Sequence, residues 1–141
     1  MAETKKIILK GRKVIGGKAE GEALVSMEPL MGWLNVNPQL GCTTERNHPL
    51  CGVSFKDKIL VFPTPRGSGG FVSYGMTVNY NTNPAAFLYT KGNNLTIFAS
   101  LVAQIPTVTD FDQDPLEVIE TGDYVKVDGD RGIVEVIKRA V

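Results

Sequence analysis

The chain has 141 residues, of which 43% are hydrophobic and 21% are charged, with 15 Lys and Arg against 15 Asp and Glu. This composition is typical of a single globular domain over residues 1–141 and excludes an intrinsically disordered chain. The formal charge of zero excludes a strong basic field, so we expect neither nucleic-acid binding nor electrostatic attachment to a membrane.

The N-terminal region contains lysines but no apolar stretch long enough for a secretory signal. No window approaches the roughly eighteen apolar residues of a membrane-spanning helix. We therefore expect a cytoplasmic protein. Because a chain with no net charge is less soluble as a monomer, the composition also favours a partner or an oligomer.

The N-terminal quarter contains two runs of apolar and β-branched residues, KKIILKGRKVIGG at 5–17 and GEALVS at 21–26. These runs predict strands, with a hairpin or loop at GGKAEG, 16–21. Residues 27–57 follow with three prolines and weak periodicity, which predicts a long irregular segment. Ordered loops of this length are more often functional than decorative.

The rest of the chain alternates between apolar strands and short helices. Continuous apolar runs predict buried strands at 58–63 and 85–91, and IPTV predicts another at 105–108. Period-two alternation on both sides of Asp128-Gly129-Asp130 predicts a C-terminal hairpin. Helices are expected at 69–80 and 94–104. In the first of these, Phe71, Tyr74 and Val78 would share one face.

One group of residues suggests a metal site at first sight. Cys42 and Cys51 flank His48, which is the only histidine in the chain. Zinc and iron–sulfur sites need three or four such ligands, usually with closely paired cysteines, and that spacing is missing here. We therefore predict no metal site in this chain and interpret the histidine as structural, leaving any role of the two cysteines open.

The most informative loop is PRGSGG at 65–70, directly after a predicted strand. Its glycines allow consecutive backbone N–H groups to point at one anion, and Arg66 adds a fixed positive charge. Such a loop can bind an oxyanion or stabilise an ionised Ser68 hydroxyl. An ordinary turn explains the same composition, and the residues alone leave both interpretations open.

Several segments follow one another in a specific order along the chain. GKAEGEALVS precedes an irregular loop with HP, and then come KILVFP, RGS, NPAA, IPTV and GDYVKVDG. This ordered set resembles the small subunit, or swivelling domain, of the aconitase X hydro-lyases, over residues 11–136. The resemblance implies a mostly β α/β fold: an aconitase-like swivelling β/β/α domain, built as a β-sandwich or open barrel with short flanking helices.

The same resemblance implies an enzyme of two parts. A large subunit carries an iron–sulfur cluster, and the small domain closes over the site as the second half of a heterodimer. The family dehydrates hydroxy acids, with mevalonate 5-phosphate as the first expected substrate and cis-3-hydroxy-L-proline as the second. In the family the serine of the RGS loop accepts the proton, and that position is Ser68. Arg66, Gly67, Gly69 and Gly70 are then expected to stabilise anionic charge around it.

The chain departs from the family pattern in two places. The first loop reads Gly32-Trp33-Leu34-Asn35 where relatives have a Gly-Gly-x-Asp-like motif, and Gly69-Gly70-Phe71-Val72 follows RGS without an early Ser or Thr. The altered first loop favours a rival hypothesis, a non-catalytic swivel module that binds an anion or a partner. A standalone serine hydrolase is a third alternative, but no G-x-S-x-G motif surrounds Ser68.

Serine is a weak base, so Ser68 can remove a proton only as an alkoxide held by positive charge and N–H donors in a dry site. The departing hydroxyl needs a Lewis acid. Since this chain offers no credible ligand set, the sequence predicts that the iron comes from the partner and that the isolated chain is folded but inactive.

Overall fold

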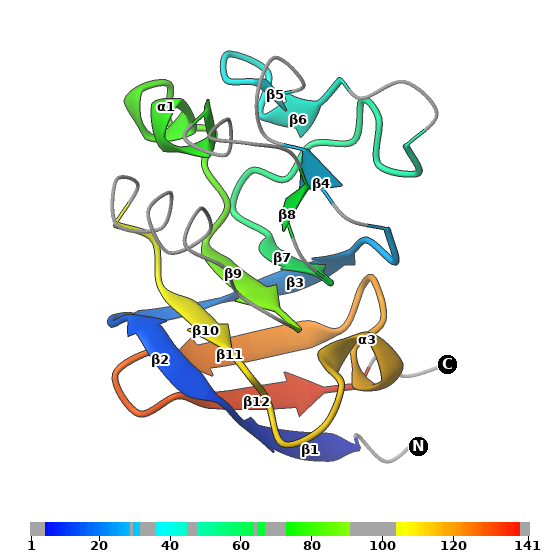
Figure 1. The fold of residues 1–141 in the computed structure, drawn as a ribbon, viewed down its shortest axis with the longest axis vertical. Helices are drawn as coiled ribbons and strands as arrows, with labels where there is room; N and C mark the ends of the chain where they lie inside the picture. The colour runs from blue at the N-terminus through cyan, green and yellow to red at the C-terminus, as the bar shows by residue number, and fades with distance from the viewer. Residues whose placement is uncertain are drawn as a thin grey trace.

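The computed structural model describes residues 5–28, 30–31, 36–44, 48–63, 65–66, 73–90 and 104–138. These residues form one large sheet, two small sheets and two short helices (Figure 1). The strands are β1 (Lys6–Lys10), β2 (Arg12–Ile15), β3 (Lys18–Val25), β4 (Leu30–Met31), β5 (Val36–Asn37), β6 (Cys42–Thr43), β7 (Ile59–Phe62), β8 (Pro65–Arg66), β9 (Ala86–Tyr89), β10 (Thr107–Thr109), β11 (Tyr124–Asp128) and β12 (Ile133–Ile137).

The large sheet has eight strands in the order β1-β12-β11-β3-β7-β9-β10-β2. Its outer strands pair antiparallel, whereas β3, β7, β9 and β10 run parallel. The two edge strands, β1 and β2, are separated in the chain only by Gly11, so the sheet must curl until its edges meet there (Figure 1). The result is an open barrel, one of the two forms that the sequence predicted.

Gly11 is required at this meeting point because the backbone passes too close to its neighbours for a side chain. A Cβ atom there would lie 2.7 Å from the backbone oxygen of Thr109 and 2.7 Å from a side-chain carbon of Val108. Both distances are shorter than van der Waals contact. The glycine therefore permits the close approach that joins the two edges.

The parallel strands β7 and β9 are buried on both faces, which explains their continuous apolar sequences. One face of β7 and β9 points into the barrel, where aliphatic residues dominate, including Ile59, Val61 and Leu88. The opposite face packs in a second, aromatic cluster. In that cluster the ring of Phe62 lies 6.2 Å from that of Phe87 in an edge-on arrangement. The strands predicted at 58–63 and 85–91 are thereby confirmed, as is the C-terminal hairpin of β11 and β12.

The hairpin alternative at 16–21 is wrong, and the loop alternative holds only for its first two residues. Only Gly16 and Gly17 lie outside strands, and β3 already begins at Lys18. The two N-terminal runs do not pair with each other either, because β2 pairs with β10 while β3 pairs with β11 and β7. Tertiary pairing with distant strands extends β3 into a glycine-containing segment that local signals assign to a turn.

Only one of the two expected helices can be compared with the described residues. Helix α1 spans Ser73–Asn79 within the predicted range 69–80, but Val78 is 42% exposed and Thr77 is fully buried, so the predicted apolar face is wrong there. Helix α3 (Pro115–Val118) was not predicted, although Asp114 caps it by accepting a hydrogen bond from the Leu116 amide at 3.0 Å. The helix expected at 94–104 falls almost wholly outside the described residues. Neither described helix is long and apolar enough to cross a membrane.

Candidate functional site

The two segments that sequence analysis singled out begin from adjacent strands. The short strands β4 and β8 pair in parallel, and Met31 lies opposite Arg66 (Figure 1). From Met31 the chain continues into the altered loop, 32–35, and from Arg66 it continues into 67–70. The structure thus brings the starting points of both segments together, although they are 35 positions apart in the numbering.

Of the five predicted site residues, only Arg66 is described, and only its backbone. It is the last residue of β8. Ser68, Gly67, Gly69 and Gly70 lie outside the described residues, as does the guanidinium of Arg66. Their roles therefore stay predictions. Within the described residues, the helix that was expected to support the loop is α1, Ser73–Asn79.

A buried Ser–His contact connects the long segment 27–57 to the ends of β3 and β7, the strands that precede β4 and β8 in the chain. Ser26, the residue after β3, is fully buried, and its Oγ lies 3.2 Å from Nε2 of His48, which is 6% exposed. The Ser26 amide also donates to the Val61 carbonyl of β7 at 2.8 Å. His48 is thereby attached to the point at which β7 leads toward β8.

The partners of the imidazole define its protonation. The Leu50 amide donates to Nδ1 of His48 at 3.0 Å, so Nδ1 presents a lone pair and the ring proton is on Nε2. The Nε2–H then donates to Ser26 Oγ, and the Ser26 hydroxyl donates to the Glu28 carbonyl at 2.6 Å. Both ring nitrogens are therefore used in holding the segment in place, as the structural interpretation of His48 predicted.

Sequence reasoning missed Ser26 altogether. A serine after a strand is ordinary, and its partner lies 22 positions away in a segment without periodicity. The only available signal was that His48 is the single histidine of the chain, which identifies no contact.

The residues once considered as metal ligands do not fit an iron–sulfur cluster or zinc. Cys42 is buried, Cys51 is exposed, and both are free thiols. Burial, and to a lesser extent the neighbouring Cys51, raises the pKa of the Cys42 thiol, which disfavours the thiolate that a metal needs. His48 has no free ring nitrogen. Across the described residues, no three His, Cys, Asp or Glu side chains gather in a group that could hold a metal.

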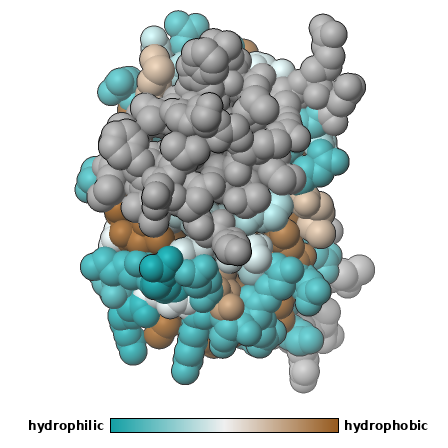
Figure 2. Space-filling model, viewed as in Figure 1, coloured by the Kyte–Doolittle hydropathy of each residue, from teal (hydrophilic) through white to brown (hydrophobic). Residues whose placement is uncertain are grey.

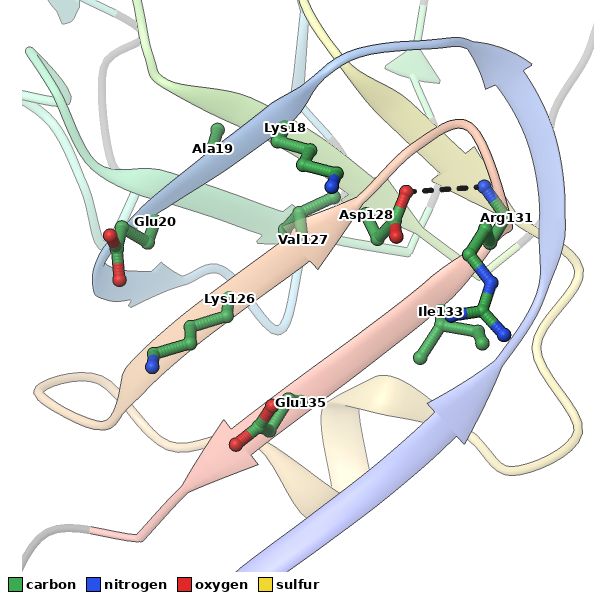
Figure 3. A pocket seen from close by; sticks show the side chains of 9 residues that line it. All are labelled: Lys18, Ala19, Glu20, Lys126, Val127, Asp128, Arg131, Ile133 and Glu135. Carbon is green, nitrogen blue, oxygen red and sulfur yellow. Dashed lines mark hydrogen bonds between the residues drawn. The ribbon is translucent and has the colours of Figure 1, made fainter.

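A hollow of about 590 Å³ lies on the outer face of the sheet, at the opposite end of β3 from Ser26 (Figure 3). Lys126 of β11 lies directly between Glu20 of β3 and Glu135 of β12, and Asp128 lies opposite Lys18. Facing strands thus place opposite charges across from each other, as is common on exposed faces of sheets. The hollow is lined by Lys18, Ala19, Glu20, Lys126, Val127, Asp128, Arg131, Ile133 and Glu135. With three positive and three negative side chains, it lacks the charge bias that an anionic substrate needs.

Comparison with known protein families gives one match that covers most of the chain. A family profile described as "Aconitase X swivel domain" matches residues 8–136. Among curated relatives, a protein of Methanosarcina mazei named "Phosphomevalonate dehydratase small subunit" is 36% identical over 94% of this chain and 93% of the relative. A protein of Thermococcus kodakarensis with the same name is 39% identical over 92% and 96% of the two chains.

Solved structures agree with this match. The crystal structure of Thermococcus kodakaraensis aconitase X in its holo-form superposes with a TM-score of 0.86 at 34% identity, covering 94% of this chain and 99% of the other. A solution NMR structure of a UPF0107 protein gives a TM-score of 0.83 at 30% identity over 94% and 100% of the chains. The predicted family and the predicted fold, a mostly β swivelling domain with few helices, are both confirmed.

Proposed function

The chain belongs to the aconitase X swivel-domain family, and we propose that it is the small subunit of a heteromeric dehydratase that converts mevalonate 5-phosphate to anhydromevalonate phosphate. The observation that carries this proposal is the match to relatives named as phosphomevalonate dehydratase small subunits, which spans more than nine-tenths of both chains. A dehydratase of this kind is a hydro-lyase. The small-subunit name implies a large subunit as partner.

In this proposal Ser68 is the base. Its alkoxide takes the proton beside the substrate carboxylate, and the electron pair of the broken C–H bond forms the C=C bond. The C–O bond to the hydroxyl breaks with its electron pair going to oxygen, and the oxygen takes up a proton from solvent and leaves as water. Ser68 releases the proton that it accepted to solvent and returns to the alkoxide. Arg66 and the amides around Gly67, Gly69 and Gly70 keep Ser68 ionised by surrounding it with positive charge and N–H donors.

Two structural features support this assignment. The parallel pairing of β4 with β8 starts the 32–35 and 67–70 segments side by side. The strands that lead into these segments, β4 and β8, follow in the chain the carboxyl ends of the parallel strands β3 and β7. The contact between His48 and Ser26 attaches the long segment 27–57 to this end of β3 and β7.

Aconitase-family enzymes depend on an iron–sulfur cluster. Because the described residues of this chain do not fit a cluster, we assign the cluster to the large subunit, and no step of the proton transfer above depends on it. We further assign the complex to the cytoplasm, where free thiols such as Cys42 and Cys51 remain reduced.

The test is anaerobic reconstitution with the large subunit. We expect no turnover of mevalonate 5-phosphate by either chain alone and steady turnover by the mixture. Preferential dehydration of cis-3-hydroxy-L-proline would change the assigned substrate but leave the assigned enzyme class, hydro-lyase, unchanged. A stable complex that dehydrates neither compound would contradict the enzymatic proposal and favour the non-catalytic module.

A further inference from the structure

Three segments of the chain form one continuous unit at the end of the molecule that carries β4 and β8 (Figure 1). The segments are 36–44, 48–55 and 73–82, and we call them together the uncharged lobe. The Phe55 amide donates to the Gly41 carbonyl at 2.8 Å, and the Thr82 hydroxyl donates to the Pro38 carbonyl. Gly41, with φ of 68°, packs so tightly on Thr82 that a Cβ atom would lie 2.7 Å from it.

The described residues of the lobe include no Asp, Glu, Lys or Arg, although 21% of the whole chain is charged. Glu45 and Arg46, between its first two segments, lie outside the described residues, and Lys56 and Asp57 border it. The one ionisable base in it, His48, is buried as the neutral tautomer described above. By contrast, the described surface over β1, β2 and the C-terminal hairpin is largely hydrophilic (Figure 2). A surface that contacts only water normally carries charges, so the depletion requires an explanation.

The lobe also exposes large apolar side chains. Eight large hydrophobic residues are exposed among the described residues, and five belong to the lobe. Their exposed fractions are 66% for Leu40, 41% for Val53, 49% for Met76, 42% for Val78 and 47% for Tyr80. Charge depletion together with exposed aliphatic, Met and Tyr side chains is the composition of the centre of a protein interface.

The position of the lobe identifies its partner. Segment 32–35 joins β4 to β5, and segment 67–72 joins β8 to α1, so the lobe is covalently continuous with both segments of the candidate site. A base on 67–70 that acts on a substrate held by another chain brings the adjoining surface against that chain. The exposed apolar side chains Leu40, Met76 and Tyr80 would then lie on the surface that faces that chain.

We propose that the uncharged lobe is the surface through which this chain docks on the large subunit, which must present a complementary surface poor in charge. This inference rests on the proposed function in that it takes the large subunit as the partner. It adds the location of the interface, which includes α1 and the β5–β6 turn and leaves out the charged outer face of the sheet.

Substitutions that introduce charge test the location directly. Val78→Lys and Leu40→Glu place a charge in the lobe, and Ile8→Lys is the matched control, because Ile8 is 44% exposed on β1 and is similar in size to Val78. With the full-length large subunit in its holo-form under anaerobic conditions, we expect each lobe variant to raise the dissociation constant about tenfold or more. We expect the control to change it less than about twofold. Circular dichroism melting verifies that all three variants are folded.

Hydrogen exchange on the unmodified complex gives a second measurement that needs no variant. Amides in 36–44, 48–55 and 76–82 should exchange more slowly in the complex, and those of β1, β11 and β12 should not change. Protection of β1, β11 and β12 in place of the lobe would overturn the proposal, as would a lobe variant that binds like the wild type. A dimer of the isolated chain that Val78→Lys dissociates would instead assign the lobe to a second copy.

These outcomes are separable from those of the proposed function. A complex that forms through the lobe but dehydrates nothing leaves the docking surface standing and removes the enzymatic role. A complex that turns over mevalonate 5-phosphate with an unprotected lobe removes the docking surface alone. Absence of any complex between the two wild-type chains overturns both the docking surface and the proposed function.

Discussion

The contact between Ser26 and His48 makes a quantitative prediction about stability. Ser26→Ala removes the acceptor of the His48 Nε2–H at a site where the imidazole is 6% exposed, so water cannot readily replace it. A buried donor left without a partner costs about 1–3 kcal/mol. For a domain of this size, that corresponds to a fall in Tm of roughly 4 °C per kcal/mol. Urea unfolding followed by circular dichroism measures the free energy of unfolding directly.

A double-mutant cycle separates this contact from general damage. His48→Asn retains a side-chain acceptor for the Leu50 amide but has no N–H that reaches Ser26. In that background there is no buried Nε2–H to leave unpaired, so Ser26→Ala should cost less by a coupling energy of about 0.5–3 kcal/mol. An equal cost of Ser26→Ala in both backgrounds would refute the assigned hydrogen bond.

Three further predictions concern the thiols, the barrel closure and a buried ion pair. Because burial raises the pKa of the Cys42 thiol, Cys51 should react first with a maleimide at neutral pH, and labelling of Cys42 should require a higher pH, as followed by mass spectrometry. Gly11→Ala should destabilise the fold by about 1–3 kcal/mol, measured by urea unfolding, because the new methyl group meets the backbone of β10. Asp123→Ala should lower the free energy of unfolding by about 3 kcal/mol, because it leaves the mostly buried Lys138 ammonium, 2.5 Å from that carboxylate, without its main partner.

For each of these three predictions, one result would contradict the reasoning. Equal labelling rates at both cysteines would show that Cys42 is as accessible and as acidic as Cys51. A Gly11→Ala variant with unchanged stability would mean that the edges of the sheet do not meet as tightly as described. For Asp123, the control is Lys138→Met, which removes the charge along with the pair and should cost less than Asp123→Ala; the reverse order would contradict the ion-pair account.

The strands of the barrel could be predicted from sequence wherever burial determines composition. Continuous apolar runs identified β7 and β9 because both faces of these parallel strands are covered. The alternating C-terminal segment identified β11 and β12 because only one of their faces is buried. In both cases the pattern reflects what each face contacts, and that information is local to the strand.

Predictions failed where the structure depends on distant partners. The start of β3 at Lys18 depends on pairing with Asp128, and no signal near 16–21 indicates that partner. Helix α3 is a single turn, too short for periodicity, and only its Asp-Pro start at 114–115 could have identified it. The contact of Ser26 with His48 likewise joins two positions that are 22 residues apart, one after a strand and one in an irregular segment.

The candidate site was found by the order of its motifs rather than by chemistry visible in composition. The residues left open whether PRGSGG is a turn or an anion loop, and the family match supplies the enzymatic context. The structure adds that the loop starts beside the altered segment 32–35, through the pairing of Met31 with Arg66. In the function proposed above, substrate preference depends on side chains contributed by two polypeptides, of which this chain is one.

The most direct measurement of the central claim is the turnover of mevalonate 5-phosphate by the reconstituted complex with Ser68→Ala in this subunit. Loss of a general base predicts a fall in kcat of about 10²–10⁴-fold, while the affinity of the two subunits and the melting temperature stay at wild-type values. Undiminished kcat in a fully assembled Ser68→Ala complex would contradict the account, because the proton would then be accepted elsewhere.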